Sequence, residues 1–578
     1  MAAQEQVCFE QFPVTSPSIE ASELPLQRLY RCEQSRPAEP LFTQPLHGRV
    51  IEWNWASAMR EVRQVAAWIK AQNWPPGSRL VILSRNSAWW LMADFAVWMA
   101  GHISVPLYPA ASNATLESLI RHCDPVACFV GPFNAADGSI HSLFSSVRCI
   151  TFPSFTGEMP PSATRWEDIV RDQQPLPGTP VRSAPEIATI IYTSGTTGQP
   201  KGAMHTFQGL SLMGKSMAPA LANPPRGNDR ILSYLPLAHI AERAIVEMNA
   251  LFTPLEVFFA DSQETFLDDL KRARATLFFS VPRLYARFQQ KVFEAMPEKK
   301  LSRLLAIPLV GRLVRKKLLD RLGLSHARMV AGGGAATPVE LIKWYRKLGL
   351  NFIEGYGMTE TGITHVPLPG AYRLGFVGNA SAVAKTRISP EGEVQIQGPM
   401  NMLGYFRSPE LTRQAMTEDG FFRTGDRGEI DSQGRLRLFG RLREEFKTSK
   451  GKYVVPSRIE MLLGASTLVE STAVFGAGMT LPFAMVVMPL HKREEAMTSE
   501  GRAEIQGELI ALIRSANAQL EHHEHLRFIA VCQAPWTVDN GFLTPTLKVR
   551  RAALEKAFES RFSQWEKLKR EVVWLEAQ

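Results

Sequence analysis

The chain has 578 residues, 45% of them hydrophobic, and this length indicates two or more globular domains. Lys and Arg number 65 against 56 Asp and Glu, a formal net charge of +9. Such a mild basic excess fits a nucleic acid, a membrane surface or anionic substrates. The sequence shows no zinc-ligand spacing, no long basic tail and no aromatic RNA-binding signature, so no nucleic-acid partner is expected.

Six cysteines, at positions 8, 32, 123, 128, 149 and 532, are sparse and irregularly spaced. This usage favours a reduced, cytoplasmic compartment. The first residues, Met-Ala-Ala-Gln-Glu-Gln, lack the basic start and apolar core of a signal peptide. The most apolar stretch, Trp89 to Tyr108, is interrupted by Asp94, His102 and Pro106. It predicts a helix followed by a buried strand rather than a membrane span.

In chain order, residues 1–45 are expected to form an N-terminal arm. Trp55 to Gln72 has the apolar spacing of a helix, and Arg79 to Leu83 that of a buried strand. Helical and strand-like runs alternate up to about residue 180, which indicates parallel α/β layers. The Pro-rich segment 173–185 is expected to be a linker.

A second alternating block covers residues 205–360, and a small β subdomain is expected over 375–440 because short strands and turns dominate there. After Gly440 the pattern restarts with an α+β layout. The predicted fold class is therefore α/β: a large N-terminal domain of layered α/β sheets with a small β subdomain, residues 1–440, and a smaller mobile α+β C-terminal domain, residues 441–578.

The segment Tyr192-Thr-Ser-Gly-Thr-Thr-Gly-Gln-Pro-Lys-Gly202 follows the apolar run Ile187 to Ile191. Its glycines let successive backbone N–H groups point at an anion, its hydroxyls add donors, and Lys201 adds a positive charge. A strand that leads into such a loop indicates a polyphosphate site, whereas the alternative is a solvated turn. The glycine-to-lysine spacing does not fit a Walker A loop.

Four more segments follow. They are Gly355-Tyr-Gly-Met-Thr-Glu360, Phe422-Arg-Thr-Gly-Asp426, Gly440-Arg-Leu-Arg-Glu-Glu-Phe-Lys447 and Leu543-Thr-Pro-Thr-Leu-Lys548. Together, and in this order, the five motifs resemble those of the adenylate-forming superfamily, which includes acyl-CoA synthetases, luciferases and the adenylation domains of peptide synthetases. Val105-Pro-Leu-Tyr-Pro109 resembles the acyl-CoA synthetase pattern, so the resemblance covers nearly the whole chain.

The resemblance implies a two-step reaction that uses ATP, Mg²⁺ and CoA. A carboxylate and ATP give an acyl-adenylate and pyrophosphate, and CoA then takes the acyl group as a thioester. The first step brings two anions together, so the site must screen their repulsion and hold the attacking oxygen in line.

The resemblance also assigns the phosphates and the metal. The β- and γ-phosphates would be held by the loop residues Thr193, Ser194, Gly195, Thr196, Thr197, Gly198 and Lys201. Thr196 would lie at the Mg²⁺ ion, with Glu360 as the metal ligand and Thr359 as a donor to the α-phosphate. A carboxylate at a helix start is the alternative reading of Glu360.

The resemblance also implies which residues bind the nucleoside and which lysine is mobile. Tyr356, next to Gly357, would stack on adenine, with Gly333, Gly334 and Ala335 on the other side of the base. Asp426 would accept hydrogen bonds from the ribose hydroxyls. Lys548 would bridge the α-phosphate and the substrate carboxylate. Without the motifs, Asp426 would be a turn residue and Lys548 an ordinary surface lysine.

Arg441, Arg443 and Lys447 resemble hinge residues that contact phosphate or ribose. The chain departs from the family pattern at two positions: many relatives have Lys or Asp in place of Arg443, and Asp in place of Glu444. The phosphate contact of Arg443 is therefore in doubt. His239, in Leu235-Pro-Leu-Ala-His-Ile240, resembles a segment that borders the acyl pocket in the long-chain branch, although a lone histidine is more often structural.

The resulting hypothesis is a cytoplasmic long-chain fatty acid–CoA ligase. Two alternatives stay open: an adenylating ligase for aryl or medium-chain acids or for transfer to a carrier protein, and a non-catalytic anion-binding or membrane-attached module. The segment 298–323 carries eight Lys or Arg among leucines, and Pro308 is expected to split it into two helices. It favours either a solvated helix pair or peripheral contact with the inner face of a membrane. The oligomeric state is not predicted.

Overall fold

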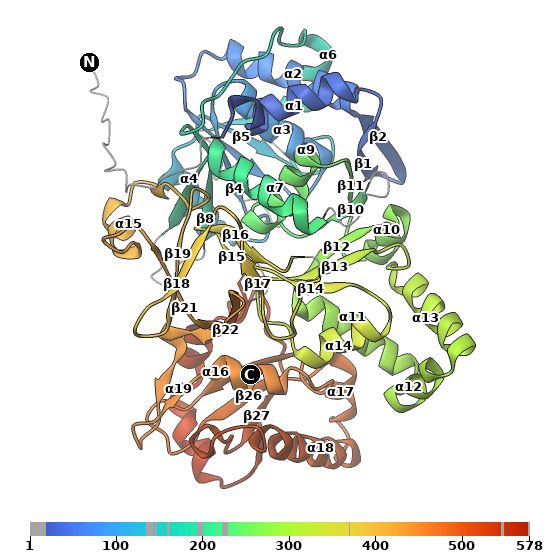
Figure 1. Cartoon of the computed structure of the whole chain (residues 1–578), viewed down its shortest axis with the longest axis vertical. Coiled ribbons are helices and arrows are strands. Elements are labelled where there is room, and N and C mark those ends of the chain that lie inside the picture. The colour runs from blue at the N-terminus through green and yellow to red at the C-terminus, as the bar shows by residue number, and fades with distance from the viewer. Residues whose placement is uncertain are drawn as a thin grey trace.

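The computed structural model describes residues 19–133, 144, 147–158, 162–193, 200–221, 229–368, 370–544 and 548–575. A large upper body of α/β layers stands on a smaller C-terminal body, with a β subdomain between them on one side (Figure 1). This arrangement of mixed α/β layers above an α+β unit confirms the predicted fold class. Among the described helices, none combines the length and the hydropathy that crossing a bilayer requires.

The first sheet has eight strands and carries the predicted phosphate-loop strand. Its core strands are parallel, whereas β9 pairs antiparallel with β8, and β20 with β9. Along the sheet the order is β20 (Gly404–Tyr405), β9 (Lys201–Thr206), β8 (Ile187–Thr193), β4 (Ile103–Leu107), β3 (Arg79–Leu83), β5 (Ala127–Val130), β6 (Arg148–Thr151) and β7 (Thr164–Arg165).

The second sheet has seven strands, of which β1 and β10 to β14 are parallel and β2 is antiparallel to β1. The order is β14 (Phe352–Glu354), β13 (Met329–Gly332), β12 (Leu277–Ser280), β10 (Asp229–Ser233), β11 (Leu255–Phe259), β1 (Pro40–Leu46) and β2 (Arg49–Asn54). Helix α3 (Ala88–Met99) contacts strands of both sheets, and every one of its residues is buried. This position explains why its sequence is apolar all round.

The third sheet is the β subdomain and is wholly antiparallel, as its alternating sequence predicts. Its order is β15 (Tyr356–Met358), β16 (Gly362–Val366), β17 (Gly378–Ala380), β22 (Arg435–Arg441), β21 (Phe422–Ile430), β19 (Glu393–Gln397) and β18 (Lys385–Ile388). The C-terminal body has a hairpin of β23 (Phe446–Lys447) and β24 (Tyr453–Val454) and a mixed sheet of β25 (Ser471–Phe475), β26 (Phe483–Val487), β27 (Ile529–Cys532) and β28 (Val572–Trp574).

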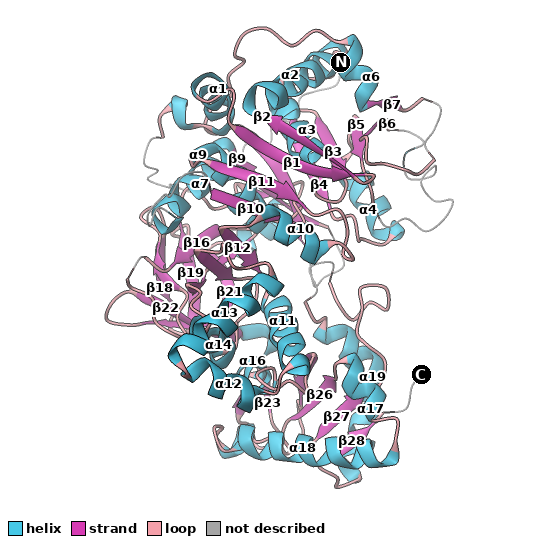
Figure 2. Ribbon diagram, turned by 90° about the vertical axis from the view of Figure 1, so that its right-hand side faces the viewer, coloured by secondary structure: helices cyan, strands magenta, loops and turns pink. Residues whose placement is uncertain are grey.

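Helices cover the faces of these sheets (Figure 2). Those of the larger body are α1 (Pro25–Ser35), α2 (Trp55–Ala71), α4 (Asn113–Cys123), α6 (Trp166–Asp172), α7 (Phe207–Leu221), α8 (Ile240–Glu242), the π-helix η2 (Arg243–Met248), α9 (Asn249–Phe252), α10 (Phe266–Ala273), α11 (Pro282–Ala295), α12 (Glu298–Ala306), α13 (Pro308–Leu322), α14 (Val339–Lys347) and α15 (Pro409–Ala415). The C-terminal body has α16 (Pro456–Leu463), α17 (Leu490–Glu495), α18 (Ser499–Asn517) and α19 (Arg551–Lys567). Short 3-10 turns are η1 (Ala21–Glu23), η3 (Leu442–Glu444) and η4 (His522–Glu524).

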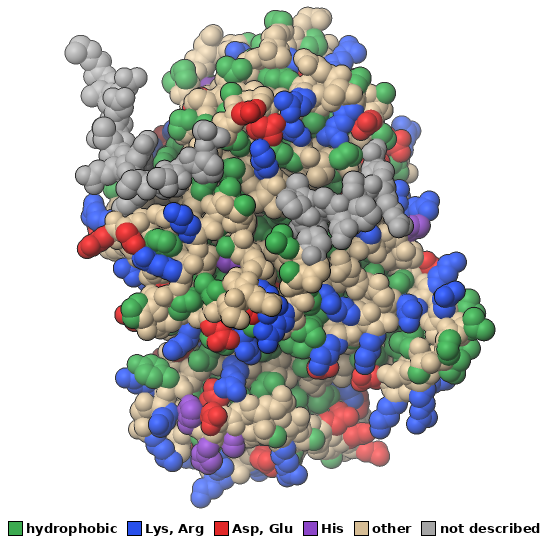
Figure 3. All heavy atoms as spheres, in the orientation of Figure 1, with side chains coloured by type: hydrophobic (Ala, Val, Ile, Leu, Met, Phe, Trp, Pro, Cys, Tyr) green, Lys and Arg blue, Asp and Glu red, His purple; other side chains and the backbone are tan. Residues whose placement is uncertain are grey.

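Most predicted elements agree with the structure. The helix at Trp55, the strand 79–83 and the helix–strand pair within 89–108 are all present, and the segment 298–323 is split into α12 and α13. The expectation of an arm was wrong for residues 19–45, because α1 and β1 pack into the core and Leu26 and Leu29 are fully buried. Helices α12 and α13 project from the body (Figure 1), and the space-filling view shows apolar side chains flanked by basic ones along that edge (Figure 3).

Candidate functional site

The predicted phosphate loop joins β8 to β9. Thr193 ends β8 and pairs with Lys201, the first residue of β9, in an antiparallel register. The loop residues between them, Ser194, Gly195, Thr196, Thr197 and Gly198, lie outside the described residues. The structure therefore places the two ends of the loop side by side and leaves the assignments within it as predictions.

Tyr405 connects the lysine of this loop to the candidate metal ligand. The Lys201 ammonium lies 6.0 Å from the centre of the Tyr405 ring, and the Tyr405 hydroxyl donates a 2.9 Å hydrogen bond to Oε1 of Glu360. Pairing of β20 with β9 brings Tyr405 to this position. The Glu360 carboxylate is buried, and no hydrogen bond to its Oε2 is recorded in the described part of the chain.

No cluster of three or more His, Cys, Asp or Glu suited to a metal ion occurs among the described residues. Among the described residues, Glu360 would therefore be the carboxylate that shares a cation with oxygens of a ligand and water. This donor set fits Mg²⁺, which usually keeps waters and substrate phosphate oxygens.

Asp426 is held by two side chains from different segments. Its Oδ2 accepts a 2.5 Å hydrogen bond from the Tyr356 hydroxyl, and its Oδ1 lies 3.0 Å from Nε of Arg441. Burial raises the pKa of Asp426, while the positive charges of Arg441 and Lys548 oppose that rise. A carboxylate has about four acceptor sites, so lone pairs remain for further donors.

Gly357 is required for the backbone geometry next to Tyr356. A Cβ at Gly357 would lie 2.2 Å from the carbonyl oxygen of Gly362, where β15 approaches β16. The close approach of these two strands is the structural reason for a glycine at position 357.

The turn Gly333-Gly334-Ala335 follows β13 and lies beside the motif around Tyr356. Gly355 donates its N–H to the carbonyl of Gly332, and Gly334 has a φ of +78°. A Cβ at Gly333 would lie 3.2 Å from the Phe279 ring. The structure therefore brings this turn next to Tyr356, and its place against the adenine stays a prediction.

Thr359 is fixed through its backbone. Its carbonyl oxygen lies 2.8 Å from Nε2 of His205, a fully buried histidine on β9. Burial lowers the pKa of His205 to about 4, so the ring is neutral and donates through Nε2–H to this carbonyl. The contact links the strand after the phosphate loop to the second nucleotide motif.

Lys548 lies within electrostatic reach of four predicted site residues. Burial and the charge of Arg441 lower its pKa, and the carboxylates of Asp426 and Glu360 oppose this. Its charge also contributes to lowering the pKa of His239 to about 4, where burial is the larger cause. Lys548 keeps part of its surface exposed to solvent, while the protein atoms around its ammonium group partly desolvate it. The C-terminal body thus delivers a lysine to residues more than a hundred positions earlier.

His239 caps the short helix α8. Its Nδ1 accepts a 3.1 Å hydrogen bond from the N–H of Ala241, which leaves the proton of the neutral ring on Nε2. Asn86 holds the preceding loop: its Nδ2 donates to the carbonyl of Leu235 at 2.6 Å, and its Oδ1 accepts from the N–H of Leu237 at 3.0 Å.

The buried carboxyl group of Glu242 holds the start of the same loop. Glu242 accepts hydrogen bonds from Ser233 Oγ at 2.8 Å and from the N–H of Tyr234 at 3.1 Å. Burial raises the pKa of Glu242 to about 8, so the group is protonated at neutral pH.

For two of the predicted hinge residues, no contact with Asp426 is recorded in the described part of the chain. Lys447 is exposed and lies 4.8 Å from the Tyr453 ring centre on the β23–β24 hairpin. Arg443 is exposed in η3, and no ion pair is recorded for it within the described ranges. Of the three hinge residues, only Arg441 contacts Asp426.

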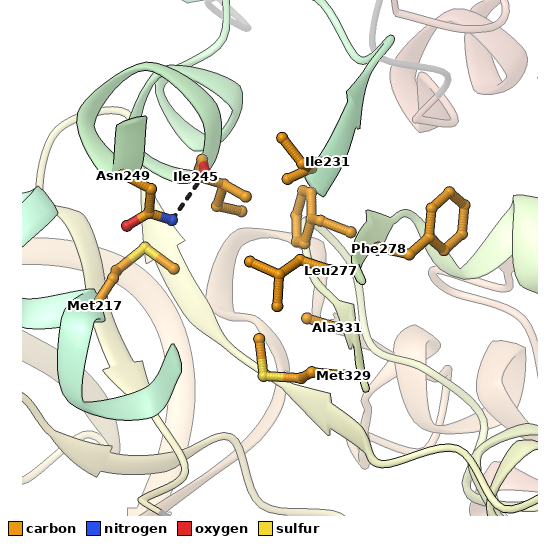
Figure 4. A pocket seen from close by; sticks show the side chains of 9 residues that line it. Met217, Ile231, Ile245, Asn249, Leu277, Phe278, Met329 and Ala331 are labelled. Carbon is orange, nitrogen blue, oxygen red and sulfur yellow. Dashed lines mark hydrogen bonds between the residues drawn. The ribbon is translucent and has the colours of Figure 1, made fainter. Parts of the chain in front are cut away.

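An apolar cavity of about 30 Å³, room for one or two water molecules, lies between the second sheet and helices α7 and η2 (Figure 4). One of its walls, Phe279, is also the side chain closest to Gly333. Its lining is Met217, Ile231, Ile245, Asn249, Leu277, Phe278, Phe279, Met329 and Ala331.

Sequence reasoning missed Tyr405, His205, Asn86 and Glu242. Tyr405 and His205 contact the predicted site residues Glu360 and Thr359. Asn86 and Glu242 instead hold the loop that precedes His239. The Gly404-Tyr405 pair carries no periodicity that would have marked it, and the other three look like ordinary core residues in the sequence.

Two sequence profiles match the chain. The one described as AMP-binding enzyme covers residues 31–406, and the one described as AMP-binding enzyme C-terminal domain covers residues 445–565. The long-chain-fatty-acid–CoA ligase FadD15 of Mycobacterium tuberculosis is 28% identical over 562 residues, which is 89% of this chain and 93% of the relative. Long chain acyl-CoA synthetase 6, peroxisomal, of Arabidopsis thaliana is 28% identical over 84% of this chain and 77% of its own length.

Solved structures share the fold. The adenylation domain of a carboxylate reductase from Mycobacterium chelonae has a TM-score of 0.78 at 20% identity, over 96% of this chain and 92% of that one. ATP-bound MatB from Rhodopseudomonas palustris has a TM-score of 0.71 at 23% identity, over 94% of this chain and all of that one. Because the first profile alone spans more than half of the sequence, the chain belongs to the AMP-binding enzyme family, within the adenylate-forming superfamily that its motifs resemble.

Proposed function

We propose that this chain is a ligase that activates a long-chain fatty acid with ATP and transfers the acyl group to CoA, with AMP and pyrophosphate as products. The observation that carries the proposal is the position of Lys548. This lysine of the C-terminal body lies in the electrostatic field of Asp426, Glu360 and Arg441. The relatives named as long-chain ligases supply the substrate class.

In the first step, the Lys548 ammonium would stabilise the negative charge that develops between the carboxylate and the α-phosphate. Asp426, held by Tyr356 and Arg441, would accept from the ribose hydroxyls, and the turn 333–335 would line the adenine together with Tyr356. Lys201 and the loop before it would neutralise the leaving pyrophosphate, and Thr359 would donate to the α-phosphate.

Mg²⁺ would be held by Glu360, with Thr196 as the proposed second protein ligand. The ion would screen the phosphate charges and help to orient them. The hydrogen bond from Tyr405 fixes Oε1 of Glu360 and leaves Oε2 for the cation.

The acyl chain would enter the apolar cavity beside Phe279, and His239 would border its path. The cavity is narrow, so a long chain has to displace side chains. Met217 and Met329 suit this because methionine is flexible and has no branch at Cβ.

The domain boundary is proposed at residues 440–441, where β22 ends and the hinge motif begins. In the orientation described, Lys548 faces the site. After adenylation the C-terminal domain would rotate about the hinge, withdraw Lys548 and admit CoA, in the manner of other hinged enzymes. Arg443 and Lys447, which have no recorded contact with Asp426 in this orientation, are proposed to contact the nucleotide in the other.

The proposed location is the cytoplasm, with peripheral contact to the inner face of a membrane. Long-chain acids partition into bilayers, so an enzyme that uses them gains from working at that surface.

Pyrophosphate release over a panel of acids tests the proposal. Acids of 6 to 18 carbons and benzoate are offered, each with CoA or a carrier protein as acceptor. The proposal predicts the highest kcat/KM for the longer acids with CoA. Preference for benzoate or hexanoate, or transfer only to the carrier protein, would favour another adenylating ligase. Absence of ATP–pyrophosphate exchange with every acid would favour the non-catalytic module.

A further inference from the structure

Helices α12 and α13 form a rigid hairpin inserted between the helix that follows β12 and the start of β13. Leu301 and Leu322 anchor its base in the core. At the tip, the N–H of Gly311 donates a 2.6 Å hydrogen bond to the carbonyl of Ile307, and a Cβ at Gly311 would lie 2.5 Å from the carbonyl oxygen of Leu305. The turn between the helices is therefore tightly packed.

The tip presents aliphatic side chains to solvent. Leu309 is 77% exposed and Leu313 is 69% exposed, with Ile307 at 48% and Val310 at 39%. These four residues fall within seven positions at the turn between α12 and α13, the helices that project from the molecule at that edge (Figures 1 and 3). Because these side chains are exposed, they do not stabilise the fold by burial. An exposed apolar cluster of this kind is typical of a site that contacts a partner or a membrane.

Basic side chains line both helices of the hairpin, from the tip to the base. Seven of them are exposed, and no ion pair is recorded for any of the seven within the described ranges: Lys299, Lys300, Arg303, Arg312, Lys316, Lys317 and Arg321. The hairpin itself carries two acidic residues, Glu298 and Asp320. On α10, which packs against α13, Asp268 and Asp269 already pair with Lys271 and Arg272. The net charge of the hairpin is therefore strongly positive.

The apolar tip together with the basic helices indicates which kind of partner could cover this surface. A pair of solvated helices explains the lysines but not four aliphatic residues at the outermost turn. A second copy of the chain would bring the same positive charges together. An acidic protein would match the charges, yet it offers no general reason for an apolar convex tip. A bilayer with anionic lipids matches both features, because apolar residues enter the acyl boundary while the basic residues contact the headgroups.

We propose that the α12–α13 hairpin docks this protein on anionic membranes, with Ile307, Leu309, Val310 and Leu313 inserted at the headgroup boundary. Arg312 lies within the tip, Lys316 and Lys317 lie about one turn behind it, and all three bind the negative headgroups. The proposal deepens the peripheral location given above and rests on the proposed function only for its biological purpose, because the docking itself requires no catalysis.

Co-sedimentation with vesicles tests it. The full chain is mixed with vesicles of phosphatidylcholine and phosphatidylglycerol, 60:40, at low and at high salt. Wild type should bind at low salt and dissociate at high salt. R312Q/K316Q/K317Q should weaken partitioning about 100-fold, since each basic residue near an anionic surface contributes about five-fold. L309S/L313S should weaken it at least about ten-fold, because two inserted side chains are lost.

Matched controls use exposed residues of the C-terminal body. K556Q/K567Q/R570Q makes the same charge change, and M497S removes a side chain that is 85% exposed. Both should bind as wild type does. If the two charge variants lose binding equally, the contact is a non-specific effect of net charge and the proposal fails. Unchanged binding of L309S/L313S would also overturn it, as would failure of wild type to bind.

Two further measurements are needed. The first tests whether a second copy of the chain covers the tip, and the second tests the ligase activity separately from docking. A concentration-dependent dimer in sedimentation velocity that L309S/L313S abolishes would make the tip an interface between copies, against the proposal. ATP–pyrophosphate exchange with a water-soluble medium-chain acid should be the same in wild type and the hairpin variants. If wild type binds vesicles but no acid supports exchange, the ligase proposal fails while the docking proposal stands.

Discussion

The hydroxyl of Tyr356 donates a 2.5 Å hydrogen bond to Oδ2 of Asp426, a residue 70 positions further along the chain. The bond joins the second nucleotide motif to the ribose motif inside one antiparallel sheet. We expect Tyr356→Phe to lower the free energy of unfolding by about 1.5–3 kcal/mol, the usual contribution of a hydrogen bond to a charged group. The KM for ATP should rise, because Asp426 loses one of the two side chains that orient it.

Urea denaturation and ATP kinetics measure these effects. Tyr372→Phe is a matched control, since the buried Tyr372 hydroxyl has no hydrogen-bond partner among the residues that the structure describes. Its removal should leave stability unchanged or increase it. Equal losses in both variants would mean that the Tyr356 bond has no special role.

Lys548→Ala should reduce adenylation by at least about 100-fold and leave CoA transfer from a supplied acyl-adenylate largely intact. The lysine faces the site in only one of the two proposed domain orientations. In wild type, adenylation should also decline as pH rises through the lowered pKa of Lys548, because the neutral amine no longer stabilises negative charge. Single-turnover kinetics of each half-reaction between pH 6 and 10 measure both effects. Lys556→Ala, at an exposed lysine of α19, is the control; equal loss of both half-reactions in Lys548→Ala would contradict domain alternation.

Glu360→Gln should raise the Mg²⁺ concentration needed for half-maximal adenylation at least about ten-fold. The amide keeps the shape and can still accept from Tyr405, but it loses the charge that holds a hard cation. A Mg²⁺ titration of pyrophosphate release measures this. Tyr405→Phe leaves the carboxylate charged and removes only its hydrogen bond, so it should show a smaller change. An unchanged titration in Glu360→Gln would remove Glu360 from the metal site.

Arg283 on α11 pairs with Glu470 of the C-terminal body at 2.6 Å, and His491 approaches Glu294 of the same helix at 3.2 Å. These contacts hold the orientation in which Lys548 faces the site. We expect Arg283→Gln, Glu470→Gln and the double variant to slow adenylation by a similar two- to five-fold, consistent with about 0.2–1 kcal/mol for a partly exposed pair. Thioester formation from a supplied acyl-adenylate should not slow.

A double-mutant cycle on the adenylation rate tests this pair. Arg437→Gln breaks an exposed pair with Glu429 within the β subdomain and serves as the control. Additive losses in the double variant would show that Arg283 and Glu470 act independently.

Glu242→Gln should make stability less dependent on pH. Burial raises the pKa of Glu242 from 4.5 to about 8, so the folded state holds a proton that the unfolded state releases. The free energy of unfolding of wild type should therefore fall as pH rises from about 4.5 to about 8. The glutamine removes this titration and keeps an acceptor for Ser233 and Tyr234. Urea midpoints at pH 5, 6.5 and 8 compare the two slopes; parallel slopes would mean that Glu242 is ionised in the folded state.

The sequence predicted those elements in which the spacing of apolar residues indicates the buried face. Met59, Val62, Val65, Ala66 and Ile69 share one face of α2 and are all buried. It did not predict α1 or β1, because their burial depends on distant partners. Arg28 of α1, for example, donates to the carbonyl of Leu251 at 2.8 Å, across 223 positions.

The same limit applies to the site. Lys548, Glu360, Asp426 and Tyr356 could be named because each stands in a motif. Tyr405, His205 and Asn86 could not, because a core aromatic, a core histidine and a loop amide look alike wherever they occur. Their contribution is a contact with a motif residue, and such contacts are created only by the fold.

Helix α11 ends at Ala295 and α12 begins at Glu298, so two residues separate the helix that touches the C-terminal body from the projecting hairpin. Docking at the hairpin would therefore fix the large domain against the bilayer and leave the C-terminal domain as the part that swings. Every enzyme molecule on the surface would then have the same orientation. CoA would arrive, and the thioester would depart, along one constant direction relative to the lipid leaflet that supplied the acid.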